Sequence, residues 1–232
     1  MAYVDVVRAS RPYLLWAMGE SPSTNFWDSS GNGRNATSPG SNVHRQGASF
    51  PGGAGSRFVN TTHVDSNAGV LIGSSFAFDI WVTKLSHLGG QLADLNSICG
   101  ESNLSNNGMV LRWEGPSTLK LVYATTASGY QELSVTGVKH PALGRASHLA
   151  ASVGAAGRAQ IFVNGTLAAD AATVGTPAGR NGGWRLGRSL EGRYSDSIMG
   201  WHGLYDHTLD LSRVRAHYNA GRARLSRRGM RR

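Results

Sequence analysis

The 232-residue chain has a single cysteine, Cys99, and few charged residues. One cysteine excludes an internal disulfide, which argues against a disulfide-stabilised secreted scaffold, and we expect Cys99 to be a buried, inert thiol. No apolar run approaches the roughly 18 residues that span a bilayer, so membrane insertion is not expected. The run at residues 13–18 is too short for a signal-peptide core, and Gly19-Glu20 follows it in place of a small-residue cleavage site. The sequence therefore predicts no cleaved leader and no membrane partner.

Glycine is abundant, with 31 residues, and Ser, Thr and Asn lie between short apolar runs. This composition is typical of many short strands joined by turns. Strands are predicted at residues 12–19, 57–59, 76–83, 96–99, 109–113, 119–124, 132–135, 148–153, 159–163, 184–186 and 198–205. A single helix is predicted at 211–221, with Ser212 as its N-cap and Gly221 at its exit.

Turn residues separate several of these strands and predict hairpins. Asn164-Gly165 follows the alternating run 159–163 and is the strongest of these signals; 106–108 and 115–117 are similar. We see neither a second domain nor a repeat. The sequence therefore predicts one all-β domain, an antiparallel β-sandwich at residues 1–221 with one short C-terminal helix.

The formal net charge of +9 is concentrated at one end of the chain. Residues 213–232 hold eight Arg and no acidic residue, whereas the preceding 212 residues hold fifteen basic and fourteen acidic groups. We expect residues 222–232 to form a basic tail that docks on an acidic surface, unless they form a solvated terminus. No aromatic residue follows Tyr218, so nucleic acid is a weaker candidate than an acidic protein. The Arg residues of this tail are 222, 224, 227, 228, 231 and 232.

Six short motifs follow one another along the chain. They are Pro12 through Glu20, Asp28-Ser29-Ser30-Gly31-Asn32-Gly33, Ser75-Phe76 through Trp81-Val82, Phe162-Val163-Asn164-Gly165, Leu186-Gly187-Arg188, and Tyr205-Asp206-His207-Thr208-Leu209-Asp210. In this order they resemble the laminin-G-like, concanavalin-A-like jelly-roll family over about residues 8–221. The resemblance implies a jelly-roll fold much more firmly than it implies any activity.

The chain departs from the family where acidic site residues are usual. The penultimate strand, 198–203, holds no carboxylate, and the usual Trp-His before the Val-Asn-Gly strand pair is Ser147-His148 here. A hydrolase needs two carboxylates about 5–10 Å apart, whereas Asp79 and Glu114 are isolated in their strands. The eight His residues show no metal-ligand spacing beyond the weak pair His202 and His207. We expect no enzymatic activity and a structural role for Asp79, although a Ser-His-Asp arrangement stays open.

Calcium is the one cofactor that the resemblance suggests. Asp28, with carbonyl oxygens of the turn at 31–33, is the candidate metal ligand, because many relatives hold calcium with loop carbonyls and one or two carboxylates. The alternative is that Asp28 forms an Asx-turn with its own backbone.

Carbohydrate is the ligand class that remains, since exposed aromatic rings stack on sugars. The candidate residues are Trp27, Trp113, Tyr130, Trp184 and Tyr194, each at a loop or a strand end, with packing beneath a loop as the alternative. Trp16, Trp81 and Trp201 are expected in the core.

The sequence thus favours a structural or binding module, which we place on the surface of a bacteriophage virion as a minor tail or capsid decoration protein. It would be made in the host cytoplasm, bind other virion proteins through the basic tail and meet cell-surface glycans. We expect a homo-oligomer as the general prior. The alternatives are a bacterial lectin-like module and, less favoured, a glycoside hydrolase of the same fold.

Overall fold

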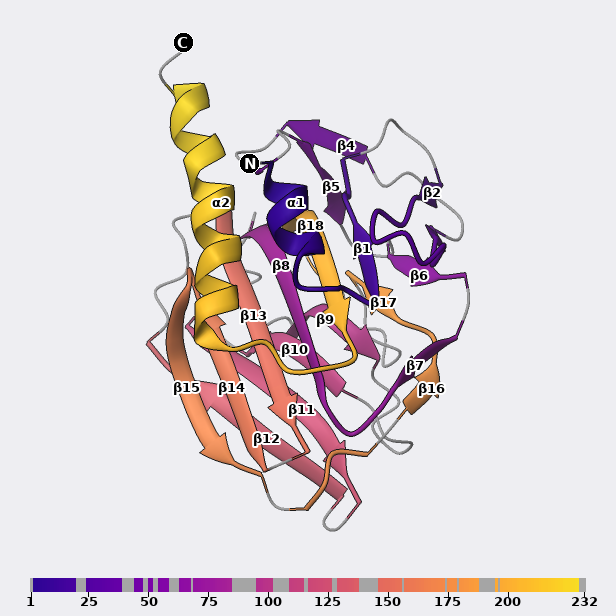
Figure 1. The fold of residues 1–232 in the computed structure, drawn as a ribbon, viewed down its shortest axis with the longest axis vertical. Coiled ribbons are helices and arrows are strands. Elements are labelled where there is room, and N and C mark those ends of the chain that lie inside the picture. Colours follow the sequence, from indigo (N-terminus) through magenta and orange to yellow (C-terminus); the bar gives the residue numbers. More distant parts are fainter. Residues whose placement is uncertain are drawn as a thin grey trace.

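The computed structural model describes residues 2–19, 24–38, 44–47, 50–51, 54–58, 63–67, 69–84, 95–101, 109–114, 117–126, 129–137, 146–155, 157–173, 175–178, 180–187, 195 and 197–229. These residues form two large antiparallel sheets, a small two-stranded sheet and two helices (Figure 1). The predicted fold class, an all-β jelly roll of the concanavalin A-like type, is confirmed.

The first sheet runs from edge to edge through β15 (Thr166–Ala172), β14 (Arg158–Val163), β13 (Ala146–Gly154), β8 (Phe76–Lys84), β18 (Ser197–Tyr205), β5 (Ala54–Phe58) and β4 (His44–Gly47), with β1 (Leu14–Trp16) paired to β18. The second sheet runs through β12 (Gly129–Val135), β11 (Thr118–Thr125), β10 (Met109–Glu114), β9 (Leu95–Glu101), β17 (Arg185–Leu186), β6 (Val64–Ser66), β3 (Ala36–Thr37) and β2 (Asn25–Phe26). The small sheet pairs β16 (Arg180–Gly182) with β7 (Val70–Ile72), and the helices are α1 (Tyr3–Arg8) and α2 (Leu211–Gly229).

The first sheet is buried on both faces. Along β8, Phe76, Phe78, Ile80 and Val82 belong to the core between the two large sheets. The alternate residues Ala77 and Trp81 belong to a second core with Tyr3, Phe162, Tyr205 and Val214. Because successive side chains of a strand point to opposite faces, the first sheet is the middle layer of three. Figure 1 shows α1 and α2 lying over its outer face, with the second sheet behind.

The two helices differ from the sequence prediction. The sequence analysis did not predict the short helix α1. Its buried face contains Tyr3 and Val7, which lie one turn apart. At its start the Asp5 carboxylate accepts a hydrogen bond from the Ala2 N–H at 2.9 Å. Helix α2 continues through Gly221 to Gly229 instead of ending at Gly221. Gly221 is buried against Trp81 and Pro51, so glycine serves there for close packing and not as a helix stop. The residues from 222 to 229 therefore extend a helix.

The predicted hairpin at Asn164-Gly165 is confirmed. Both residues have positive φ, +51° and +75°, and connect the antiparallel strands β14 and β15. The Asn164 Oδ1 atom also accepts a hydrogen bond from the His148 N–H at 2.9 Å, which ties the turn to β13. Asn106–Gly108 and Gly115-Pro116 lie outside the described residues. Neither described helix combines the length and the apolar character needed to cross a bilayer.

Candidate functional site

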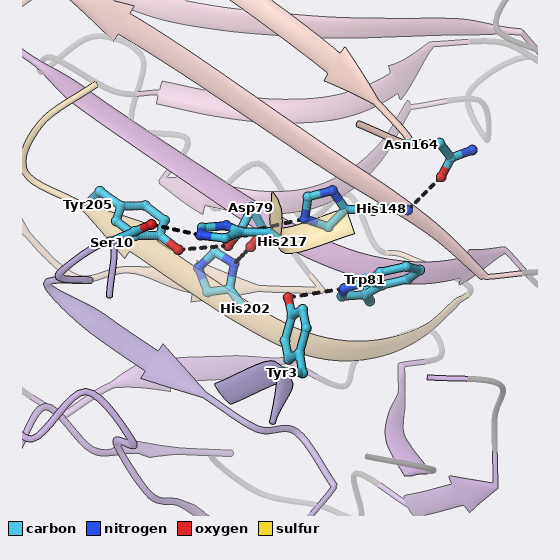
Figure 2. Close-up of polar contacts among 9 residues, drawn as sticks. All are labelled: Tyr3, Ser10, Asp79, Trp81, His148, Asn164, His202, Tyr205 and His217. Carbon is cyan, nitrogen blue, oxygen red and sulfur yellow. Dashed lines mark hydrogen bonds and ion pairs between the residues drawn. The ribbon is translucent and has the colours of Figure 1, made fainter. Parts of the chain in front are cut away.

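Polar side chains gather in the layer between the first sheet and the helices, around Asp79 (Figure 2). Asp79 occupies the side of β8 that faces the helices, between Ala77 and Trp81, and its exposed fraction is 1%. The sequence prediction of a structural Asp79 facing the same side as Trp81 agrees with this position. A buried carboxylate must be paired and hydrogen-bonded to remain charged.

Two histidines and a tyrosine supply the partners of Asp79. The Oδ2 atom lies 2.7 Å from His217 Nδ1 and 3.3 Å from His148 Nε2, and Oδ1 accepts the Tyr205 hydroxyl at 3.3 Å. Burial alone would raise the pKa of Asp79, but the hydrogen bonds and charges of His148 and His217 outweigh it and hold the pKa well below its usual range. The carboxylate is therefore ionised in the folded protein.

A third histidine, His202, lies on the opposite face of the first sheet, in the core between the two large sheets, and is neutral. Its Nε2 accepts the Trp184 Nε1–H at 2.7 Å, so its Nδ1 carries the proton and donates it to the Asp79 backbone carbonyl at 3.0 Å. Burial lowers the pKa of His202 to about 4, against the opposing effect of Asp79. Burial likewise lowers the pKa of His148, which donates its Nε2 proton to Asp79. Both rings are fully buried.

Ser10, His217 and Asp79 stand in the order of a catalytic triad. Ser10 Oγ lies 2.8 Å from His217 Nε2, and His217 Nδ1 contacts Asp79. A nucleophile must reach substrate, yet Ser10 is only 5% exposed, and the backbone N–H groups of Ser10 and Arg11 already donate to Val7 and Arg8 carbonyls. Those N–H groups cannot stabilise an oxyanion. These hydrogen bonds instead connect the segment after α1 to helix α2, and helix α2 to strand β8.

Tyr3 makes a second link between α1 and the sheet. Its hydroxyl accepts the Trp81 Nε1–H at 3.1 Å, and its ring lies 5.8 Å from that of Trp201. Trp16 and Trp81 are buried as predicted, whereas Trp201 is partly buried. The sequence analysis did not single out Ser10 or His217, and it noted His148 and His202 only for a family motif and a weak metal-ligand spacing. The available signal was three histidines at positions that the strand and helix patterns assign to buried faces.

The five predicted carbohydrate-binding residues do not form one site. Trp113 and Trp184 are 2% and 1% exposed, so their rings are covered by the core and the prediction is wrong for both. Tyr194 lies outside the described residues. Trp27, with 60% exposure, follows β2 at one edge of the second sheet, and Tyr130, with 41%, lies on β12 at the other edge. Their sugar-binding role stays a prediction.

Glu114 is not isolated, contrary to the sequence interpretation. Its carboxylate and that of Glu132 both contact Lys120 Nζ, at 2.5 and 2.9 Å, across strands β10, β11 and β12. The two acids are thus close enough to be weighed as a glycosidase pair. However, the Lys120 ammonium group contacts both carboxylates, so each acid already has a structural partner.

Asp28 forms the Asx-turn that was the alternative to calcium. Its Oδ1 accepts the N–H groups of Leu15 and Ser30, and its Oδ2 accepts the Arg34 N–H and the Ser30 hydroxyl, all within 2.9 Å. Four donors occupy the four lone-pair positions of a carboxylate, which leaves none for a cation. These hydrogen bonds favour the Asx-turn, and calcium binding by Asp28 stays a prediction. No group of three or more metal-binding side chains occurs among the described residues.

The predicted anchoring residues lie at the far end of α2. Arg222 is exposed, and Arg224, Arg227 and Arg228 belong to the helical extension. Arg231 and Arg232 lie outside the described residues. Figure 1 shows the C-terminal part of α2 projecting past the sheets.

The chain is similar to known proteins in sequence profile and in fold. Residues 58–214 match the family Laminin_G_3, described as the concanavalin A-like lectin/glucanases superfamily. No curated protein matches the chain. Domain 4 of AbnA, an extracellular arabinanase from Geobacillus stearothermophilus, solved in complex with arabinotriose, has a TM-score of 0.70 at 16% identity, covering 90% of this chain and 98% of that domain.

Two toxin domains have a similar fold over about half of their length. The receptor-binding domain of botulinum neurotoxin type G has a TM-score of 0.66 at 13% identity, with 90% of this chain and 51% of that chain covered. The binding domain of paraclostridial mosquitocidal protein 1 has a TM-score of 0.70 at 11% identity, with 92% and 53% covered. At these identities the likeness concerns the fold.

Proposed function

The chain belongs to the concanavalin A-like lectin/glucanase superfamily, and we propose that it is a non-enzymatic glycan-binding module on the surface of a bacteriophage virion. The observation that supports glycan binding is Trp27, a residue that is 60% exposed at the edge of the second sheet. A large aromatic ring that stays exposed to water contributes no hydrophobic stabilisation to the fold. Its face can instead pack against the apolar side of a sugar ring. AbnA domain 4, which has a similar fold, was solved in complex with a glycan, arabinotriose.

The described titratable clusters support a module without catalysis. Asp79 is buried and fully paired, the carboxylates of Glu114 and Glu132 share Lys120, and Asp28 is saturated by its own turn. Catalytic acids and bases need access to substrate and a pKa suited to proton transfer. Each of these acids instead has a structural partner.

The virion setting rests on charge. The body of the chain is nearly neutral, whereas residues 222–232 hold six Arg and no acidic residue. A basic helix that projects from a neutral body provides an electrostatic contact for an acidic capsid or tail surface. The body would then face outward, where host glycans lie.

A glycan array of the purified full chain, with calcium and with a chelator, tests the binding function. We expect selective retention of a glycan class in both conditions, because Asp28 offers no lone pair to the cation. Absence of binding to every printed glycan would refute this function.

Mass spectrometry of purified phage particles tests the location. We expect the chain among the virion proteins at a fixed copy number. Its absence there, together with glycan binding, would favour the alternative of a bacterial lectin-like module.

A further inference from the structure

The strand register aligns polar residues beside Trp27. In β2, β3 and β6, Phe26 pairs with Ala36 and Ala36 pairs with Ser66. Continued by one residue, this register sets Trp27 opposite Asn35 and Asn35 opposite Asn67. Two hydrogen bonds fix this row: the Asn67 N–H donates to the Asn35 carbonyl at 3.0 Å, and the Asp28 N–H donates to Asn35 Oδ1 at 2.9 Å.

A second row runs parallel to the first across four strands. Asn25 pairs with Thr37, Thr37 with Asp65, and Asp65 with Arg185. The Arg185 guanidinium binds the Asp65 carboxylate through two contacts of 2.5 and 2.8 Å. Such a bidentate pair holds both groups in a fixed orientation.

Both rows face away from the core. Phe26 and Ala36 are fully covered in the core between the sheets, and residues on either side of them along a strand point the opposite way. The exposure agrees: Trp27, Asn25 and Asn67 are exposed, whereas Asn35 and Thr37 are half-buried. The result is one exposed indole beside amide, hydroxyl and charged groups on a single sheet surface, which we call the Trp27 face (Trp27, Asn35, Asn67, Asn25, Thr37, Asp65 and Arg185).

We propose that the Trp27 face binds an uncharged oligosaccharide that lies across strands β2, β3 and β6. Trp27 would stack on one pyranose or furanose ring, and the amide of Asn67 and hydroxyl of Thr37 would hydrogen-bond to ring hydroxyls. The row from Trp27 to Asn67 spans two strand spacings, roughly 10 Å, which accommodates a disaccharide. An uncharged ligand fits because Asp65 and Arg185 neutralise each other.

This inference rests on the proposed glycan-binding function and narrows it to one surface. Tyr130, the other exposed aromatic candidate, is excluded from this site. It lies seven strands away in the same sheet, about 30 Å at the usual strand spacing. Both aromatic residues therefore cannot contact the same short oligosaccharide.

The test compares Trp27→Ala and Asn67→Ala with Tyr130→Ala and Leu71→Ala. Leu71 is 64% exposed and is therefore the matched control for loss of an exposed apolar side chain. Asn67 bonds to Asn35 through its backbone N–H, so Asn67→Ala keeps that hydrogen bond. The probes are arabinotriose, cellotetraose and chitotriose on the array, followed by calorimetry with any probe that binds the wild-type chain.

We expect Trp27→Ala to weaken binding tenfold or more and Asn67→Ala several-fold, with Tyr130→Ala and Leu71→Ala unchanged. If Trp27→Ala binds as tightly as the wild-type chain, or if Tyr130→Ala no longer binds, the Trp27 face is not the binding site, although the chain still binds a glycan. Failure of the wild-type chain to bind any array glycan would reject the proposed function itself. Melting temperatures of the variants separate loss of binding from loss of fold.

Discussion

Asp79 is a buried carboxylate that accepts hydrogen bonds from His148, His217 and Tyr205. The substitution Asp79→Asn keeps the shape but removes the charge, and it places an amide where two rings donate protons. A hydrogen bond to a charged group contributes about 1.5–3 kcal/mol, so weakening these bonds should lower the free energy of unfolding by about 3 kcal/mol. Urea denaturation measures it. Ser10→Ala, at the edge of the same cluster, removes one hydrogen bond and should cost about 1 kcal/mol. Equal stability of Asp79→Asn and wild type would contradict the role of Asp79.

The buried histidines of the first sheet, His148 and His202, predict acid sensitivity. The pKa of His202 is about 4 in the folded protein, because burial disfavours the cation, against about 6.5 in the unfolded chain. A lowered folded-state pKa means that the unfolded state binds more protons, so this stability is complete above pH 6.5 and is lost as the pH falls toward 4. Each pKa unit corresponds to about 1.4 kcal/mol, which gives a loss of about 3 kcal/mol. His148, whose pKa is also lowered, acts in the same direction.

Urea midpoints between pH 7.5 and 4.5 test this dependence. In His202→Gln the amide oxygen can still accept the Trp184 N–H, but no proton is taken up, so the slope of stability against pH should become smaller. An unchanged slope would show that His202 does not account for the acid sensitivity. Asp79, with its pKa held low, loses its stabilising charge only below about pH 4 and therefore does not affect this range.

Single residues were predictable where their position in a strand determined their burial. Trp16, Trp81 and Asp79 followed the alternation of their strands. Trp113 and Trp184 did not, because each lies near a strand end where the sequence does not show which segment covers it. The cluster around Asp79 joins residues 10, 148 and 217, and no local pattern records that these distant segments meet.

Helix α2 packs closely on the first sheet at Gly221. A Cβ atom there would come within 2.2 Å of Trp81 Cζ2 and 2.8 Å of Pro51 Cγ. Helix propensity favours alanine by about 1 kcal/mol, but overpacking costs about 1–3 kcal/mol, so Gly221→Ala should destabilise the protein overall. Asn219→Ala, on the exposed side of the same helix, is the matched control and should be neutral or slightly stabilising. Thermal melting measures both, and a Gly221→Ala variant more stable than wild type would contradict the close packing.

The same contact explains why the sequence placed the end of α2 too early. Glycine after a helical pattern usually marks a C-terminus, and Gly221 has that position in the sequence. Its actual constraint is the tertiary approach of Trp81, which becomes visible only when the helix lies on the sheet. The Asn164-Gly165 turn was predictable because positive φ at both residues is a local requirement of the hairpin.

The three-layer arrangement sets which surfaces can bind. The helices cover one face of the first sheet, and the second sheet covers the other. The strand orders β8–β18–β5 and β17–β6–β3 pair segments that are far apart in the chain. The order of the motifs was enough to predict a jelly roll. It could not show which face of the sheet the helices cover, because that depends on these long-range pairings. Of the predicted aromatic residues that the structure describes, the exposed ones are Trp27 and Tyr130, at the two edges of the second sheet.

The basic end of α2 predicts electrostatic attachment of the whole molecule. Replacing the six Arg residues at 222, 224, 227, 228, 231 and 232 by Gln lowers the formal net charge from +9 to +3 and keeps the chain length. On virions that incorporate this variant we expect at least a tenfold lower copy number at about 0.15 M salt, and weaker retention of the wild-type chain as salt rises, because exposed charges are screened.

Quantitative mass spectrometry of washed particles measures the copy number. Arg57→Gln, an exposed charge of the first sheet, is the control and should leave the copy number unchanged. The glycan affinity of the six-residue variant should equal that of wild type, because the Trp27 face lies on the second sheet and does not include α2. Equal occupancy of both chains on the virion would refute attachment through the tail.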